Sequence, residues 1–456
     1  MRTKNSSRFK GYVLAAAMAL VLGSTAASAV EKDSKLQTTL FTNVHVFDGK
    51  NEERIMNANV LVEDNLIKEI STKPITVYDA VVIDGGGRTL MPGMIDAHWH
   101  TMLAGVNAVE AFTQFDGYLQ IVASKEAEDT LLRGFTTVRD VGGNSFSLKK
   151  LVDAGRTEGP RIYPSGMAIG QTSGHSDTRG YADVPAGNSA LLNNFERSGH
   201  FIVADGVPQV LQRVRESLRM GASQIKIMAG GGTTTQFDPI DSKQYTMAEL
   251  KAAVEAAEAW NTYVGVHVYT SEGIRRAIEA GVKVLEHGHM ADEQTIKLIK
   301  EKGVWLNMQP FVADPSLEKL SDNPVTRAKQ EVMEKGTEGA YKLAKKHGVK
   351  LAWGTDILLQ PDAAKKHGNY VAIMEKWFTP YEVLKMVTHD NGQLCKLSGP
   401  RDPYQKGELG VIQGGAYADM ILVDGNPLEN LKLVTDPSKN FVVIMKDGRI
   451  YKNTLK

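Results

Sequence analysis

The regular alternation of short apolar runs with amphipathic stretches between residues 92 and 394 limits the fold more than any other feature of this chain. Eight runs have the length and composition of buried strands, and they read MIDAHWH, TTVRDVG, RIYPSG, QIKIMAGG, TYVGVHVY, KVLEHG, VWLNMQP and KLAWGTD. Helical patterns separate most of them, as in residues 246–260, 271–280 and 292–302. Repeated strand–helix units predict an α/β fold, a parallel (β/α)8 TIM barrel. A doubly wound open sheet is the alternative, but no Gly-x-Gly-x-x-Gly follows a strand to favour it.

Strand-like segments bounded by turn residues also lie at both ends of the chain. The N-terminal segments are TTLFTNVHVFDG, ANVLVEDNLIKEI and AVVIDGGGRTL, and the C-terminal ones are ADMILVDGNPL and FVVIMKDGRIYKN. Nothing helical separates the last two. We therefore expect one small β-sandwich domain built from residues 30–91 and 395–456, with the barrel of residues 92–394 inserted between them. The only cysteine, Cys395, is expected to be a small core residue.

Residues 1–29 have the three parts of a secretory signal peptide. Four basic residues precede an apolar run at residues 11–22, and Ala-Ser-Ala at residues 27–29 provides a cleavage site. We expect a periplasmic or secreted protein with no lipid-anchor cysteine, and an uncleaved anchor is the alternative. The formal net charge of the chain is zero, so the composition does not favour nucleic acid or an anionic membrane surface as a partner.

Chemistry-bearing side chains gather where the predicted strands end. In a parallel barrel the C-terminal strand ends meet at one mouth, which is where catalytic groups stand. The first strand ends in His-x-His, and the period of two puts both imidazoles on one side of it. The candidate metal ligands at the strand ends are His98, His100, Lys226, His267, His287 and Asp356.

Nitrogen and oxygen ligands of this kind suit Zn²⁺ best, and Mn²⁺, Co²⁺ or Fe²⁺ less selectively. A protonated Lys226 beside two cations would be costly, and its three donors cannot ligate a metal. Reaction of its amine with CO2 would give a carbamate whose two oxygens bridge two metals. The alternative is a strand lysine paired with a carboxylate. Each histidine could likewise be a hydrogen-bonded core residue, and Asp356 could cap a turn.

The motif order His-x-His, Lys, His, His, Asp resembles the binuclear members of the amidohydrolase superfamily. The segments TTVRDVGG, SGHSD and IKIMAGGG are most similar to its prolidase-like dipeptidases and carboxypeptidases, a group that includes ochratoxin-hydrolysing amidases. The resemblance implies that His98, His100 and Asp356 hold one metal and His267 and His287 the other. It also implies that the Lys226 carbamate bridges the two metals, and that His175 faces the substrate.

On this basis we expect a metal-bridging hydroxide to cleave the amide bond of a dipeptide or N-acyl amino acid, with catalytic roles for Asp356 and His175. Arg179, Tyr245 and Tyr269 are candidates for binding the product carboxylate. The segments 171–206 and 309–329 are candidate specificity loops. We expect a small-molecule substrate and a homo-oligomer.

Three other functions stay open. A deaminase of the same superfamily typically uses one metal and lacks the strand-4 lysine, so Lys226 argues against it. A lactonase or phosphotriesterase shares the carbamate chemistry, and only substrate tests separate it from an amidase. A non-catalytic binding protein would have to keep all six ligands without using them.

Overall fold

The computed structural model describes residues 37–180, 192–235, 237–318 and 323–455. The predicted signal peptide at residues 1–29 lies outside these ranges. The described residues belong to one compact unit, Leu36–Lys456. No helix within these ranges has both the length and the apolar composition needed to cross a bilayer.

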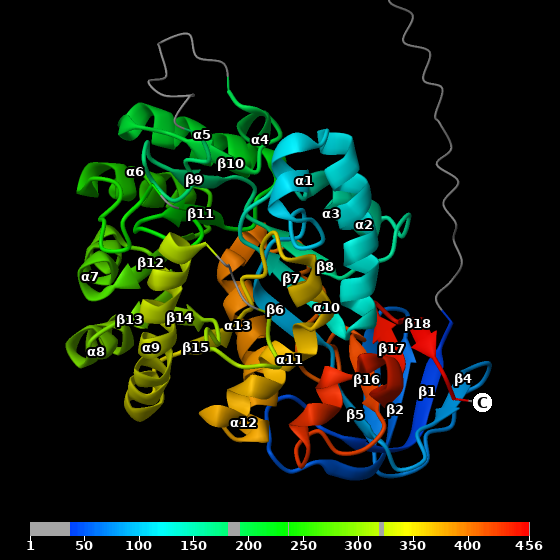
Figure 1. The fold of residues 1–456 in the computed structure, drawn as a ribbon. Helices are drawn as coiled ribbons and strands as arrows, with labels where there is room; N and C mark the ends of the chain where they lie inside the picture. Colours follow the sequence, from blue (N-terminus) through cyan, green and yellow to red (C-terminus); the bar gives the residue numbers. More distant parts are fainter. Residues whose placement is uncertain (1–36, 181–191, 236, 319–322, 456) are drawn as a thin grey trace, which may run out of the picture. The chain divides into compact units, whose positions relative to one another are not determined.

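All eight predicted strands of the alternating region are present, and they are parallel within two sheets (Figure 1). The first sheet contains β6 (Met94–Trp99), β7 (Phe135–Asp140) and β8 (Arg161–Pro164). The second has the order β10-β9-β11-β12-β13-β14-β15. Its strands are β9 (Ala168–Gly170), β10 (Phe201–Val203), β11 (Ile225–Met228), β12 (Val264–Thr270), β13 (Val284–Met290), β14 (Trp305–Met308) and β15 (Leu351–Trp353). The two unpredicted strands, β9 and β10, have three residues each, too few to show a period.

Two buried side-chain amides link the two parallel sheets. The Asn391 Nδ2 atom donates to the carbonyls of Ile95 in β6 (2.7 Å) and Trp353 in β15 (2.8 Å). At the other junction, the Gln224 Nε2 atom donates to the carbonyls of Asp140 (3.1 Å) and Tyr163 (2.9 Å). These side-chain amides thus donate to backbone carbonyls that would accept from a neighbouring strand if the ladder continued.

Helices follow most of the parallel strands and begin and end at capping residues. α7 (Ser271–Ala280) begins after the N-cap Thr270 and ends at Gly281, whose φ of 100° suits glycine. α8 (Glu293–Lys302) begins after Asp292. The other long helices are α2 (Asp116–Leu132), α3 (Phe146–Asp153), α5 (Gly206–Met220), α6 (Met247–Glu258) and α9 (Pro324–His347). The shorter ones are α1 (Ala108–Thr113), α4 (Asn194–Arg197), α10 (Pro361–Lys365), α11 (His367–Ala372), α12 (Pro380–Lys385), α13 (Asn391–Cys395) and α14 (Pro437–Asn440).

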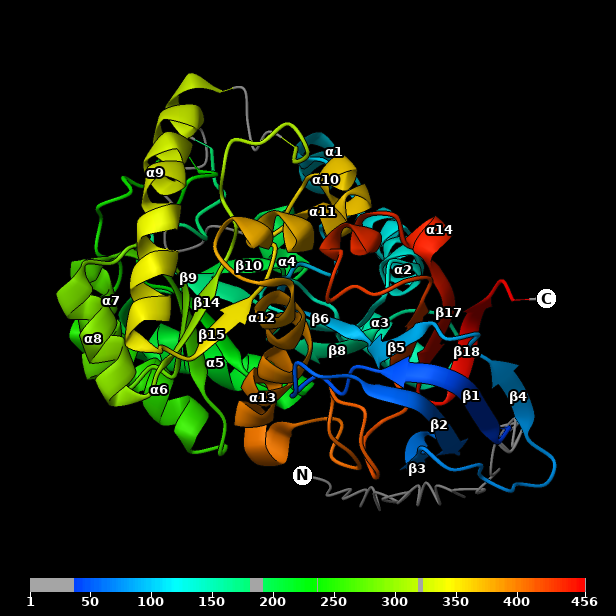
Figure 2. The ribbon, with the colours of Figure 1, turned by 90° about the horizontal axis from the view of Figure 1, so that it is seen from below.

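A third sheet joins the two ends of the chain, as the sequence predicts. Figures 1 and 2 show the N-terminal strands (blue) beside the C-terminal ones (red). The junction is an antiparallel pair in which Met420 of β16 faces Pro92 of β5. The strands are β1 (Thr39–Val46), β2 (Ile55–Glu63), β3 (Leu66–Ser71), β4 (Val81–Asp84), β5 (Thr89–Pro92), β16 (Met420–Val423), β17 (Phe441–Lys446) and β18 (Arg449–Asn453). They form one eight-stranded sheet with its own apolar core, while the sandwich form and the domain boundaries stay predictions.

Candidate active site

His98, His100 and Asp356 come together at the ends of β6 and β15. The Oδ1 atom of Asp356 lies 3.1 Å from the Nε2 atom of His98 and 3.1 Å from that of His100. One candidate ligand atom from each residue lies within 4.8 Å of the others. Gly354 permits this close approach, because a Cβ atom there would lie 2.4 Å from the Cβ atom of His98. The three side chains therefore form a ready group of metal ligands.

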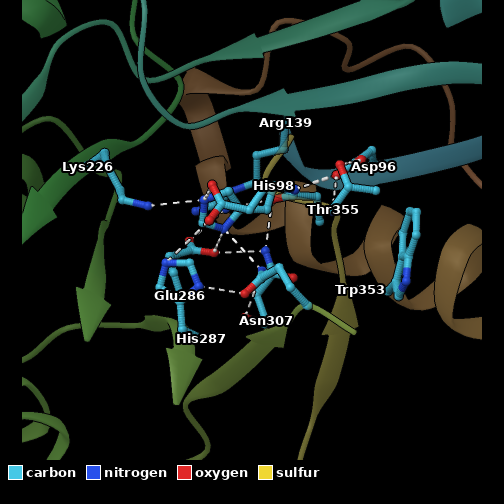
Figure 3. A network of polar contacts seen from close by, with 12 residues as sticks. Asp96, His98, Arg139, Lys226, Glu286, His287, Asn307, Trp353 and Thr355 are labelled. Atoms are coloured by element: carbon cyan, nitrogen blue, oxygen red, sulfur yellow. Dashed lines mark hydrogen bonds and ion pairs between the residues drawn. The ribbon is translucent and has the colours of Figure 1, made fainter. Parts of the chain in front are cut away.

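A buried polar network orients His98 (Figure 3). The Nδ1 atom of His98 lies 2.9 Å from the Oε2 atom of Glu286, and the Arg139 guanidinium donates to the Oε1 atom at 2.8 Å. Asn307 also donates to Glu286, at 2.8 Å. Although burial alone would raise it, Arg139 and His98 hold the pKa of Glu286 well below its usual range. The carboxylate thus fixes the Nδ1 side of His98 and leaves Nε2 facing Asp356.

Lys226 projects from β11 toward the same point (Figure 3). Its Nζ atom lies 3.4 Å from the Nε2 atom of His98, and the side chain is buried. Lys226 forms no ion pair within 4 Å in the part of the chain that the structure describes. Burial lowers its pKa to about 8, the neighbouring carboxylates notwithstanding. A larger fraction of this amine is therefore neutral, and able to react with CO2, than for an ordinary lysine.

His267 and His287 lie beside this group, on β12 and β13. The Nε2 atom of His287 is 4.0 Å from the Oδ2 atom of Asp356, and its Nδ1 atom is 2.6 Å from the Oε1 atom of Gln309. His267 lies 4.5 Å from His287 between ring centroids, with its Nε2 atom 3.1 Å from the Gly231 carbonyl. Burial holds the pKa of both histidines well below the usual value. Both rings are therefore neutral at pH 7, as metal ligands must be.

Several polar residues of the site are not among the predicted ones. Gln309 contacts both His98 (3.2 Å) and His287, and its carbonyl lies 2.8 Å from the Nε2 atom of His289. Glu286 directly precedes a predicted ligand, which is the one sequence signal for this network. An amide or guanidinium within a buried strand carries no such signal, because its partners come from distant strands.

His175 enters the site from the loop after β9. Its ring stacks on that of His267 at 4.2 Å, and its Nδ1 atom lies 3.2 Å from the Oδ2 atom of Asp238. Gly232 makes room for it, since a Cβ atom at Gly232 would lie 1.7 Å from the Cε1 atom of His175. Asp238 thus holds one side of the ring and leaves the Nε2 atom for another partner.

The six candidate metal ligands and His175 line a cavity of about 290 Å³. Five aromatic side chains face it, and they are Phe112, Phe195, Phe201, Tyr269 and Phe311. Both predicted loops contribute, through Thr178 and Phe195 from one and Phe311 and Thr326 from the other. The cavity thus combines polar candidate ligands with aromatic side chains, which is typical of small-molecule sites.

The three predicted carboxylate-binding residues lie in different places. Tyr269 lines the cavity, and burial raises the pKa of its hydroxyl. Arg179 is ion-paired with Asp177 at 2.6 Å, and Tyr245 donates its hydroxyl to the Ala204 carbonyl at 3.0 Å. Neither Arg179 nor Tyr245 is among the described residues that line the cavity. The structure therefore brings one of the three to the site.

The fold and this donor set define a class of enzyme. Residues 89–452 match the sequence profile of the amidohydrolase family, so the chain belongs to that family and is a hydrolytic enzyme. Ochratoxinase of Aspergillus niger is 30% identical over 420 residues, covering 88% of this chain and 84% of that protein.

Solved structures give the same assignment. A prolidase complexed with N-methylphosphonate-L-proline has a TM-score of 0.84 at 32% identity, covering 92% of this chain and 100% of the other. A Xaa-Pro dipeptidase with bound methionine in its active site has a TM-score of 0.76 at 28% identity, covering 91% and 100%. The chain lies in the prolidase and ochratoxinase branch of the amidohydrolase superfamily, which confirms the resemblance drawn from its motifs.

Proposed function

We propose that this protein is an exported, metal-dependent hydrolase that cleaves the amide C–N bond of dipeptides or N-acyl amino acids. The convergence of His98, His100 and Asp356 on one point beside Lys226 carries the proposal. The names of two similar proteins, prolidase and Xaa-Pro dipeptidase, support a peptide-like substrate. We further propose that the parallel strands close into one (β/α)8 barrel, supported by the bonds that Asn391 and Gln224 make.

The donor set fits two divalent ions, with Zn²⁺ first. His98, His100 and Asp356 would hold one, His267 and His287 the other, and Lys226 would bridge them as its carbamate. This assignment needs neutral imidazoles as ligands and a neutral lysine amine that can react with CO2. Burial favours both, because it lowers the pKa of His267, His287 and Lys226. When bound, the ions would polarise the amide carbonyl and supply a nucleophile at neutral pH.

Asp356 would accept the proton of the attacking water and pass it to the leaving nitrogen. Although burial would raise it, the histidines around Asp356 hold its pKa well below the usual value, so the carboxylate is ionised at neutral pH. Its Oδ1 atom faces His98 and His100, and its Oδ2 atom lies on the His287 side. One carboxylate can thus serve both as a ligand and as a proton carrier.

His175 would donate a hydrogen bond to the oxyanion that develops on the carbonyl. Asp238 accepts from the Nδ1–H of its ring, so Nε2 would donate toward the cavity when the ring carries both protons, with the Asp238 carboxylate balancing the charge. One such donor is typically worth about 3 kcal/mol in the transition state. The aromatic side chains of the cavity would bind an apolar side chain of the substrate.

The deciding experiment measures amino-acid release from a panel of dipeptides and N-acyl amino acids. Mature protein is assayed with Zn²⁺ and bicarbonate, and with a chelator as the control. We expect chelator-sensitive release that is restored by Zn²⁺ and is highest for apolar side chains. No release from a protein that holds about two metals per chain would contradict the proposal and favour a lactonase or phosphotriesterase. A content near one metal would favour a deaminase.

A further inference from the structure

A second cavity, of about 300 Å³, lies at the opposite end of the parallel strands. Arg161, which lines it, is the first residue of β8, whereas His98 and His100 lie at the C-terminal end of β6 and Asp356 follows β15. The cavity is also lined by the C-terminal end of α3, by the β17–β18 hairpin and by residues 403–417 in part. It is therefore distinct from the candidate active site.

The charge of Arg161 is fully met within the protein. Its guanidinium lies 2.9 Å from an oxygen of Asp419 and 2.6 Å from one of Asp447. The same group stacks on the rings of Tyr404 (5.0 Å) and Tyr417 (3.9 Å). Arg161 thus acts as a structural joint between β8 and the sheet built from the chain ends.

Lys446 next to this joint has no such partners. It is only 5% exposed, yet within the described residues its ammonium makes no hydrogen bond and no ion pair within 4 Å. Its ammonium lies 5.8 Å from the centroid of the Tyr451 ring, and the carboxylates of Asp419, Asp447 and Asp153 act on it from beyond 4 Å. Burial, and next the charge of Arg161, lower its pKa to about 8. A buried cation without a hydrogen-bond acceptor is costly unless a ligand supplies one.

The lining of the cavity has an excess of positive charge. Four of its side chains are cationic (Arg161, Lys406, Lys446 and Arg449) and two are anionic (Asp153 and Asp447). Both carboxylates have partners, because Asp447 pairs with Arg161 and Asp153 accepts from the Tyr404 hydroxyl at 2.8 Å. Lys406 and Arg449 are exposed at the rim and form no ion pair in the described ranges.

We propose that this cavity binds a small phosphate-type oxyanion, either inorganic phosphate or a small phosphomonoester, with Lys446 as its buried anchor. The three donors of an ammonium, with a guanidinium and a second ammonium at the rim, match an anion that accepts from several directions. The volume admits such an anion with its first waters. The proposal does not depend on the chemistry at the other end of the strands.

The test is calorimetric titration of inorganic phosphate into the metal-loaded protein. Lys446→Met is compared with wild type and with Lys68→Met, a control at an exposed lysine of the same sheet. We expect one phosphate per chain to lose at least about tenfold in affinity in Lys446→Met and to keep its affinity in the control. Equal affinity in all three proteins would place the phosphate elsewhere and overturn the proposal, as would no binding by wild type.

Thermal unfolding guards against a variant that folds poorly. Phosphate should raise the Tm of wild type and of Lys68→Met but leave that of Lys446→Met unchanged. Arg449→Gln, at an exposed position, should bind phosphate several-fold more weakly, and unchanged affinity in this variant would contradict the proposal.

Titrations with glycerol 3-phosphate and succinate distinguish the possible ligands of the cavity. Tighter binding of the ester identifies a phosphomonoester, tighter binding of phosphate identifies the free ion, and binding of succinate alone would overturn the phosphate assignment.

Discussion

Two buried arginines on neighbouring strands of one sheet serve different ends of the molecule. Arg139 lies near the C-terminal end of β7, pairs with the single carboxylate of Glu286, and through it reaches His98. Arg161 begins β8, pairs with Asp419 and Asp447, and joins the parallel strands to the sheet of the chain ends. Both residues are buried arginines, so their positions along the strands account for the difference. The network near the C-terminal strand ends orients a candidate metal ligand, and the network at the N-terminal end holds two sheets together.

The largest effect should follow a change at the catalytic end itself. We expect Asp356→Asn to lower kcat by about 10²- to 10⁴-fold, because the amide keeps an oxygen for a metal but cannot accept the proton. Metal content, measured by elemental analysis, should stay near that of wild type. Asp362→Asn on α10 is the matched control, since this exposed carboxylate pairs with Lys365. Near-normal turnover in Asp356→Asn would exclude the proton-carrier role.

The two arginines themselves give the next test. Replacing either with Met leaves a buried carboxylate without its cation, which typically costs about 3–5 kcal/mol in the free energy of unfolding. We expect both variants to unfold at lower denaturant concentration. Only Arg139→Met should also lose metal affinity, because only its network ends on a candidate ligand. Equal loss of metal in Arg161→Met would show that the two networks are coupled.

A smaller and more local effect is expected from Glu286→Gln. The amide can still contact the Nδ1 atom of His98, but it no longer fixes that nitrogen as the donor or raises the basicity of the ring. We expect metal affinity to fall by about 10- to 100-fold. With saturating Zn²⁺, kcat should recover to within a few-fold of wild type. A kcat that stays low at saturating metal would mean that Glu286 acts in the reaction and not through His98.

The strands, more than the side-chain partners, could be predicted from sequence. The presence of the eight strands, the ranges of α7 and α8 to within one residue, and the pairing of the chain ends follow from the hydrophobic pattern and the turn residues, although several strands end up to three residues before their predicted ends. Gln309 and Asn391 could not be foreseen, because an amide contacts whatever the fold brings to it. Arg179 is predicted to bind the product carboxylate, but its partner could have been read from the sequence. Asp177 lies only two residues away and forms the ion pair with it.

The smallest expected effect follows the loss of one hydrogen bond that positions the Arg139 side chain. Tyr263 accepts a hydrogen bond from the Arg139 Nε atom at 2.9 Å, and Tyr263→Phe would leave that buried donor unpaired. We expect a loss of about 1–2 kcal/mol in the free energy of unfolding, measured with urea. Tyr404→Phe beside Arg161 should cost a similar amount, because its hydroxyl accepts from the Ile162 N–H at 3.0 Å.

Turnover then separates the two tyrosine variants. Glu286 keeps its bond to the Nη1 atom of Arg139 in Tyr263→Phe, so kcat should stay within about twofold of wild type in both proteins. A fall in kcat confined to Tyr263→Phe would show that His98 responds to small displacements of Arg139 through Glu286. Turnover would then depend on the orientation of His98 as well as on the charge of Glu286. The contacts of Arg161, in contrast, would affect only the free energy of unfolding.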